Sequence, residues 1–146
     1  MNTDKTQSEK LPQDAVMQSV LKASDLRIGN KILFLGDVVT FKNITEFRED
    51  GIFWIKTFEP KIESKNFHFK PIKLTEEWLN KLGFFIVETN GKFEATLPNF
   101  RYNIYWTKHT DGFLFCDGET ALINFNYLHE LQNLVFALGQ RELTVA

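Results

Sequence analysis

The sequence has almost no cysteine and no long apolar run. Cys116 is the one cysteine among 146 residues, so no disulfide can form within the chain. This excludes the disulfide-stapled scaffolds that are typical of small secreted proteins. No segment approaches the roughly 18 uninterrupted apolar residues of a membrane-spanning helix, and the opening MNTDKTQSEK lacks the apolar region of a secretory signal. We therefore expect a soluble, cytoplasmic protein that does not enter a membrane.

An excess of charge of either sign is also missing. The chain carries 17 Lys and Arg residues against 19 Asp and Glu residues, a net charge of −2. Such a balance gives no overall attraction to nucleic acid or acidic membranes, although it leaves room for a local patch. What the sequence does have is many aromatic side chains, with 15 Phe residues among them. Their number indicates a well-filled core, in one domain or in two small units.

Metal and cofactor motifs are absent as well. His129-Glu130 begins like the HExxH motif of zinc proteases, but Asn133 stands where the second imidazole is needed. One histidine is too few ligands for zinc, and no phosphate-binding glycine loop, GxSxG or CxxC motif occurs. We expect no metal and no cofactor, with His129 on the solvated face of a helix.

The chain divides into three segments of different pattern. Residues 1–24 read as a polar tail with a short amphipathic helix at 12–22, residues 25–71 as a small β subdomain, and residues 72–146 as an α+β subdomain. The apolar positions of the short helix recur at helical spacing. They are Val16, Met17, Val20 and Leu21. Because so short a helix is marginal alone, it should dock on the body of the protein or on a partner.

The β subdomain is predicted from short runs of β-branched and aromatic residues. Turns such as Glu49–Gly51 separate these runs. We expect four short strands over residues 26–70, in a small curled antiparallel sheet or an SH3-like barrel. Residues Lys61–Asn66 are predicted to form a polar loop, followed by a short extended piece at Phe67–Phe69.

A helix is predicted over Leu74–Phe84. Thr75 is a suitable N-cap and Gly83 a suitable stop. Its buried stripe comprises Trp78, Leu79 and Leu82. Asn90-Gly91, farther along, is the strongest short hairpin signal known, and it begins an antiparallel meander of four or five strands.

The last part of the chain is predicted to form a closing helix from Asn126 to Leu138. Asn126 would be its N-cap and Gly139 its stop, and Glu142–Val145 would add an edge strand. A wide apolar face on this helix suits packing on a sheet. Together these elements describe an α+β fold, with the closing helix packed on an antiparallel meander.

Strict alternation assigns the faces of the meander. Two sets of residues should point inward, and the residues between them outward. The inward sets are Phe93, Ala95 and Leu97, and Tyr102, Ile104 and Trp106; the outward residues include Asn103, Tyr105 and Thr107. The preceding strand is apolar at both parities through Phe84–Val87, so we expect both of its faces to be covered. The second cover could be the N-terminal sheet, the helix at 12–22, or another chain, including a second copy. Phe85, Val87 and Tyr105 are the candidate residues of this interface.

Three segments carry a resemblance to a family. They are LRIGN at Leu26–Asn30, LTEEWLNKLGF at Leu74–Phe84 and LHELQNLVFALGQREL at Leu128–Leu143. In these segments the chain resembles a family of small Bacteroidota and phage-associated proteins without an assigned function, which share LRIGN, LTEEWLxKxGF and HxLQNLxxAL motifs. Here Glu130 stands where a Gln is usual. The resemblance implies a bacterial or phage-borne cytoplasmic protein and implies no activity.

A basic and aromatic strip runs from Lys56 to Lys73. Lysines contact phosphates and exposed aromatic rings stack on bases, so the strip is a candidate surface for single-stranded nucleic acid. The residues chosen from it are Lys61, Lys65, Phe67, His68 and Lys70. The simpler alternative is that its phenylalanines fill the core of the first subdomain.

Two catalytic arrangements are weak alternatives. Cys116 would need His109, across a turn, to lower its pKa, and a small buried hydrophobe is the commoner role of such a cysteine. Asp111, Asp117 and Glu119 cluster on turns, which turn geometry also explains. The leading hypothesis is therefore a non-catalytic protein-interaction or accessory module. A nucleic-acid-binding accessory protein comes second and a small enzyme third.

Overall fold

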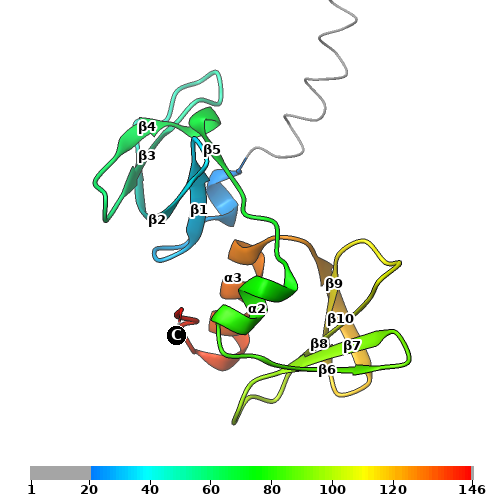
Figure 1. Cartoon of the computed structure of the whole chain (residues 1–146). Coiled ribbons are helices and arrows are strands. Elements are labelled where there is room, and N and C mark those ends of the chain that lie inside the picture. Colours follow the sequence, from blue (N-terminus) through cyan, green and yellow to red (C-terminus); the bar gives the residue numbers. More distant parts are fainter. Residues whose placement is uncertain (1–20, 146) are drawn as a thin grey trace, which may run out of the picture. The chain divides into compact units, whose positions relative to one another are not determined.

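The computed structural model describes residues 21–145, and the chain divides into two compact units between Pro71 and Ile72 (Figure 1). Each unit is described by itself below. The helix predicted at residues 12–22 lies outside the described residues, except for Leu21 and Lys22, which are not helical.

The first unit is a five-stranded antiparallel sheet. Its strands are β1 (Lys31–Phe34), β2 (Asp37–Thr45), β3 (Trp54–Thr57), β4 (Glu63–Lys65) and β5 (Phe69–Lys70), in the order β4-β3-β2-β1-β5. Short 3-10 helices lie at η1 (Ala23–Asp25) and η2 (Asn66–His68). The predicted loop at Lys61–Asn66 is wrong, because Glu63–Lys65 pairs with β3. Edge strands often carry polar residues, and a short polar strand has the same sequence pattern as a loop.

One cluster of apolar side chains holds this sheet together. Its buried members are Leu21, Ile32, Val39, Phe41, Phe53, Ile55 and Phe69. Ile32, Val39, Phe41 and Ile55 lie on β1, β2 and β3, with Phe53 just before β3, Phe69 on β5 and Leu21 before η1. Val39 and Phe41, like Phe53 and Ile55, are two residues apart, as one covered face of a sheet requires. β4 and β5 are the two edges, and no ladder joins them in the described part of the chain. Closure into an SH3-like barrel is therefore not confirmed.

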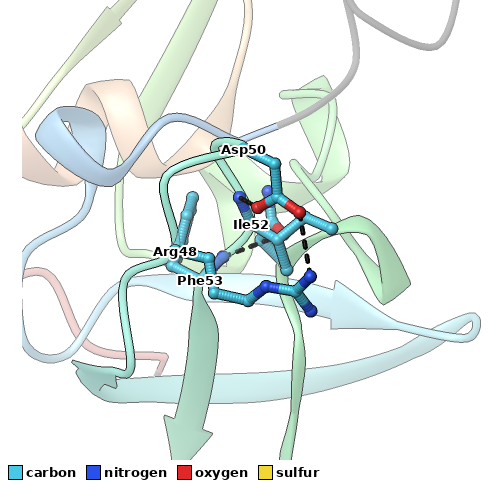
Figure 2. A network of polar contacts seen from close by, with 5 residues as sticks. Arg48, Asp50, Ile52 and Phe53 are labelled. Atoms are coloured by element: carbon cyan, nitrogen blue, oxygen red, sulfur yellow. Dashed lines mark hydrogen bonds and ion pairs between the residues drawn. The ribbon is translucent and has the colours of Figure 1, made fainter.

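The connection from β2 to β3 is a tight polar turn (Figure 2). The Gly51 amide donates to the Arg48 carbonyl at 3.1 Å, and the Arg48 amide donates to the Ile52 carbonyl at 2.8 Å. The Asp50 carboxylate accepts from the Ile52 amide and pairs with the Arg48 guanidinium at 3.0 Å. Gly51 has a φ of +88°, which favours glycine. The turn predicted at Glu49–Gly51 is confirmed.

The second unit joins a five-stranded meander to two helices (Figure 1). The elements are α2 (Glu76–Lys81), β6 (Phe85–Thr89), β7 (Lys92–Thr96), β8 (Asn103–Thr107), β9 (Phe113–Asp117), β10 (Thr120–Phe125) and α3 (Leu128–Gly139). The strands are hydrogen-bonded in the order β10-β9-β8-β7-β6, all antiparallel. Two antiparallel sheets with few helices make the chain α+β, as predicted.

Local signals placed α2 and the first hairpin of the meander. The Thr75 hydroxyl accepts from the Trp78 amide at 3.2 Å, so Thr75 is the N-cap of α2. Asn90 and Gly91 have φ values of +52° and +82°, and Thr89 pairs with Lys92 across them. These dihedrals are those of a two-residue hairpin turn. Both predictions are confirmed.

The ends of α3 differ from the prediction. Its N-cap is Tyr127, one residue after the predicted Asn126, and the Glu130 carboxylate accepts from both of their backbone amides at 3.0 Å. At the other end the left-handed residue is Gln140, with Gly139 still helical. A Cβ on Gly139 would lie 2.5 Å from the Phe100 ring, so close packing requires this glycine. Residues 142–145 form no strand, and the predicted edge strand is wrong.

The core of the second unit comes from one face of the meander and one face of α3. Ala95, Ile104 and Phe115 are buried on β7, β8 and β9, and α3 contributes fully buried aliphatic side chains. These are Leu128, Leu131 and Val135. No helix in the described part of the chain is long and apolar enough to span a membrane.

Candidate functional site

The second sheet has an outer face opposite its buried face. The strand registers place Val87, Glu94, Tyr105 and Leu114 side by side in one row, and Phe85, Thr96, Asn103 and Cys116 in the next. Because alternate residues share a face, both rows lie on the side of the sheet opposite Ala95, Ile104 and Phe115. The structure therefore brings together the three interface residues that the sequence suggested, Phe85, Val87 and Tyr105. We call this surface the outer face of the second sheet.

Two apolar side chains of β6 are exposed on this face. Phe85 is 65% exposed and Val87 is 59% exposed, whereas Phe84 is 5% exposed. The described residues leave this face of β6 exposed, so its cover by the helix predicted at 12–22 or by another chain stays a prediction. β6 is the last strand of the sheet, so a neighbouring strand shields its side chains on one side only.

A polar cluster lies beside these apolar side chains. The Asn103 amide nitrogen donates to the Glu94 carboxylate at 2.8 Å and to the Tyr105 hydroxyl at 3.0 Å. Asn103 was predicted to point outward, and it does so by register, yet it is only 8% exposed because these neighbours cover it. Its side-chain oxygen is buried and has no hydrogen-bond partner among residues 21–145. Burial, followed by the hydrogen bond and charge of Glu94, raises the pKa of Tyr105.

Tyr105 lines two clefts. The larger has a volume of about 480 Å³ and extends towards Thr107, Asp111 and Asn124. The smaller, of about 340 Å³, lies towards Val87 and Glu94. Sequence reasoning missed Lys92, which lines both, and Glu94, because polar residues on an exposed strand face look like ordinary solvated positions. The missing information was the cross-strand register, which pairs Glu94 with Tyr105 and Lys92 with Thr107.

The catalytic arrangements fare differently. Cys116 is 2% exposed and lies opposite Asn103, whereas His109 follows Thr107 at the other end of β8, so the register keeps them apart. Burial also raises the pKa of the Cys116 thiol, which opposes nucleophilic use.

The three turn carboxylates do not act as one group. The Asp117 carboxylate accepts from the Arg101 guanidinium at 2.6 and 3.1 Å, outside the clefts. Asp111 and Glu119 both line the larger cleft.

The predicted basic strip is split by the fold of the first unit. Lys61 precedes β4 and Lys65 is its last residue, at one edge of the sheet, whereas Lys70 is on β5, at the other. Phe67 is 48% exposed, and its ring meets that of His68 edge-on at 4.6 Å. Phe69, in contrast, is fully buried, which agrees with the alternative that phenylalanines of the strip fill the core of the first subdomain.

The histidine of the incomplete zinc motif is not solvated. His129 is 4% exposed, so its expected place on a solvated helix face is wrong. The ring of Tyr127 stacks on it at 5.9 Å, and α3 buries that side. No cluster of metal-ligating side chains occurs among the described residues.

Comparison with known proteins gives no relative. No protein-family model matches the chain, and neither the curated proteins nor the solved structures contain a match. The function is therefore argued from the surfaces described above.

Proposed function

We propose that this protein is a non-catalytic accessory module that binds a partner protein at strand β6. The observation that carries the proposal is the exposure of Phe85 and Val87 on the outer face of the second sheet. Large apolar side chains grouped on one strand favour removal from water, whereas single exposed ones are ordinary.

The edge of β6 favours an extended partner segment. An unpaired strand edge offers backbone amides and carbonyls to another strand, and proteins usually block such edges with lysine, proline or a bulge. β6 contains none of the three, and its five residues pair with β7 in unbroken register. The opposite edge, β10, is interrupted by a register shift between Ala121 and Ile123. We therefore place the partner strand against β6, with apolar side chains beside Phe85 and Val87.

The polar cluster around Asn103 is a second observation that favours a partner on the outer face of the second sheet. A buried acceptor without a partner costs about 1–3 kcal/mol, so native proteins rarely leave one. Asn103 is in the row of Phe85. This oxygen lies two strands inward from β6, so its donor would come from a part of the partner that lies across the outer face rather than from the strand against β6.

The test compares two lysine substitutions on the two edges of one sheet. Val87→Lys adds a charge to β6, and Leu122→Lys adds the same charge to β10, where Leu122 is 48% exposed. Tagged full-length protein and both variants are used to recover proteins from a nuclease-treated Bacteroidota lysate, and self-association is measured by sedimentation. We expect one partner, or a second copy, to bind the parent and Leu122→Lys, with at least tenfold weaker binding to Val87→Lys. Hydrogen exchange of the β6 amides should slow in the complex.

Two outcomes contradict the proposal. One is binding of Val87→Lys as strong as that of the parent, which would place the partner away from β6. The other is a protein that neither recovers a partner nor associates with itself.

Two finer statements belong with the proposal. We propose a bacterial or phage origin and a cytoplasmic location, which the LRIGN and LTEEWLxKxGF segments support. We also propose that the first unit is related to SH3-like barrels. The support is the strand order, in which β1 to β4 form a meander and β5 returns to pair with β1, with the 3-10 helix η2 between the last two strands.

A further inference from the structure

The outer face of the first sheet gathers lysines and aromatic rings. Register places side chains of β2, β3 and β4 in two rows there, Thr45, Trp54 and Lys65, and Asn43, Lys56 and Glu63. β2 has a register shift between Phe41 and Asn43, so Lys42 is an extra residue at this point. Its Nζ lies 5.7 Å from the centre of the Phe58 ring. A bulge re-aims a side chain in this way.

Three lysines of the first unit line one cleft. Lys42, Lys56 and Lys61 line a cleft of about 310 Å³, together with Thr57, Ile62 and Glu63. None of the three lysines forms an ion pair with another described residue. The one carboxylate of the cleft, Glu63, accepts a hydrogen bond from the Thr45 hydroxyl at 2.9 Å. The cleft therefore has a net positive charge.

The loop that carries Lys61 is held in place. The Thr57 hydroxyl donates to the Pro60 carbonyl at 2.6 Å and accepts from the Ile62 amide at 3.0 Å. The Thr57 amide also donates to the Ile62 carbonyl at 2.9 Å. Lys61 lies between these anchored residues, so its backbone loses little freedom when a ligand binds.

Two exposed aromatic rings of this unit lie beside lysines, Phe58 beside Lys42 and Phe67 beside Lys65. Phe58 is 41% exposed and Phe67 is 48% exposed. Lys65 lies between Trp54 and Phe67, with its Nζ 5.9 Å and 5.8 Å from the two ring centres. Lysines and aromatic rings are thus neighbours on β2, β3 and β4 and on the residues that follow β3 and β4.

We propose that this face binds single-stranded nucleic acid. A backbone phosphate would lie between Lys42, Lys56 and Lys61, and bases would stack on Phe58 and Phe67. The exposed rings favour a single strand over an acidic protein, because only its bases offer flat faces to stack on. The small net charge of the whole chain does not reveal this site, because positive and negative residues are unevenly distributed between the two units. Residues 21–71 carry nine Lys and Arg against seven Asp and Glu, and residues 72–146 carry six against nine.

The test is a titration of labelled polythymidylate and polyuridylate with the full-length chain at several salt concentrations. Fluorescence anisotropy of the label measures the affinity. Lys56→Ala and Lys61→Ala should each weaken binding several-fold. Each should also lower the slope of log affinity against log salt by about 0.7, since one phosphate contact is lost. Phe58→Ala should weaken binding roughly tenfold with the salt slope unchanged, because stacking releases no counterions.

Lys70→Ala is the matched control. It removes the same charge from an exposed position at the opposite edge of the same sheet, so affinity and salt slope should stay close to those of the parent. All of these side chains except Lys56 are exposed and Lys56 is half-buried on the outer face, so the variants should remain folded. Circular dichroism checks this point.

Three results would overturn the proposal. The first is no binding to either oligonucleotide at low salt. The second is a Lys70→Ala effect as large as that of Lys56→Ala, which means diffuse attraction. The third is equal binding to polyglutamate with no effect of Phe58→Ala, which assigns the face to acidic proteins instead.

Discussion

At the scale of single residues, burial determines the protonation of two titratable side chains of the second unit, Cys116 and Tyr105. Cys116 has its Sγ 3.8 Å from the Leu114 carbonyl and is almost fully covered. Tyr105 lies beside Glu94 and Asn103 between two clefts. The pKa of each group is raised, for Cys116 by burial and then by the negative charge of Glu94. Both groups therefore stay protonated in neutral solution, which suits packing and hydrogen bonding.

We predict that, at about pH 8, Cys116 reacts with iodoacetamide at least about 100-fold more slowly in the folded protein than in the urea-unfolded chain. The reason is that only an exposed thiolate is the nucleophile. Mass spectrometry measures the rate. The unfolded thiol loses its proton first as pH rises, so the free energy of unfolding should fall from pH values near the ordinary pKa of 9.0 upward. Cys116→Ala should lose that part of the decline. Rapid labelling of the folded chain would revive the catalytic alternative.

At the scale of elements, short helices here depend on their caps. α2 has six residues, too few for a stable helix in isolation. Thr75 supplies its first hydrogen bond, and Glu76 and Glu77 place negative charge at its positive end. Leu79, fully buried, fixes it to the core of the second unit.

We predict that Thr75→Ala lowers the free energy of unfolding by about 1 kcal/mol, because the Trp78 amide loses its acceptor. Thr75→Ser keeps a hydroxyl in the same place and should stay within about 0.5 kcal/mol of the parent. Urea unfolding followed by circular dichroism gives both values. Equal destabilisation by the two variants would show that the methyl group of Thr75 matters more than its hydroxyl.

At the scale of the whole molecule, each unit has the parts of an independent domain. The first has a five-stranded sheet over its own apolar cluster, and the second has another five-stranded sheet with α2 and α3. Units of 50 residues or so can fold alone when they have a core of their own, although they are marginal.

We predict that residues 72–146 fold when expressed alone, since their buried residues are supplied by the meander and helices of that unit. The fragment should show a dispersed amide NMR spectrum and a cooperative thermal transition. Fragment 21–71 should show the same with a lower melting temperature, because it is smaller. A collapsed spectrum for residues 72–146 would mean that the second unit depends on the rest of the chain.

The sequence by itself determined the features that depend on neighbouring residues. The cap at Thr75, the hairpin at Asn90-Gly91, the turn at Gly51 and the α+β class follow from local backbone preference and periodicity. These energies act within a few residues, so the pattern is visible in the chain. The same reasoning failed at β4, whose three polar residues show no β pattern and form a strand only because β3 supplies hydrogen bonds.

Only the tertiary structure decided the surfaces. The register of β8 put Asn103 rather than His109 beside Cys116, and the bulge in β2 aimed Lys42 at the cleft of Lys56 and Lys61. The position of β6 at a sheet edge left Phe85 and Val87 exposed although their pattern predicts burial. Each of these depends on which strand lies next to which. That choice is made by contacts between distant residues, whose energies no local pattern contains.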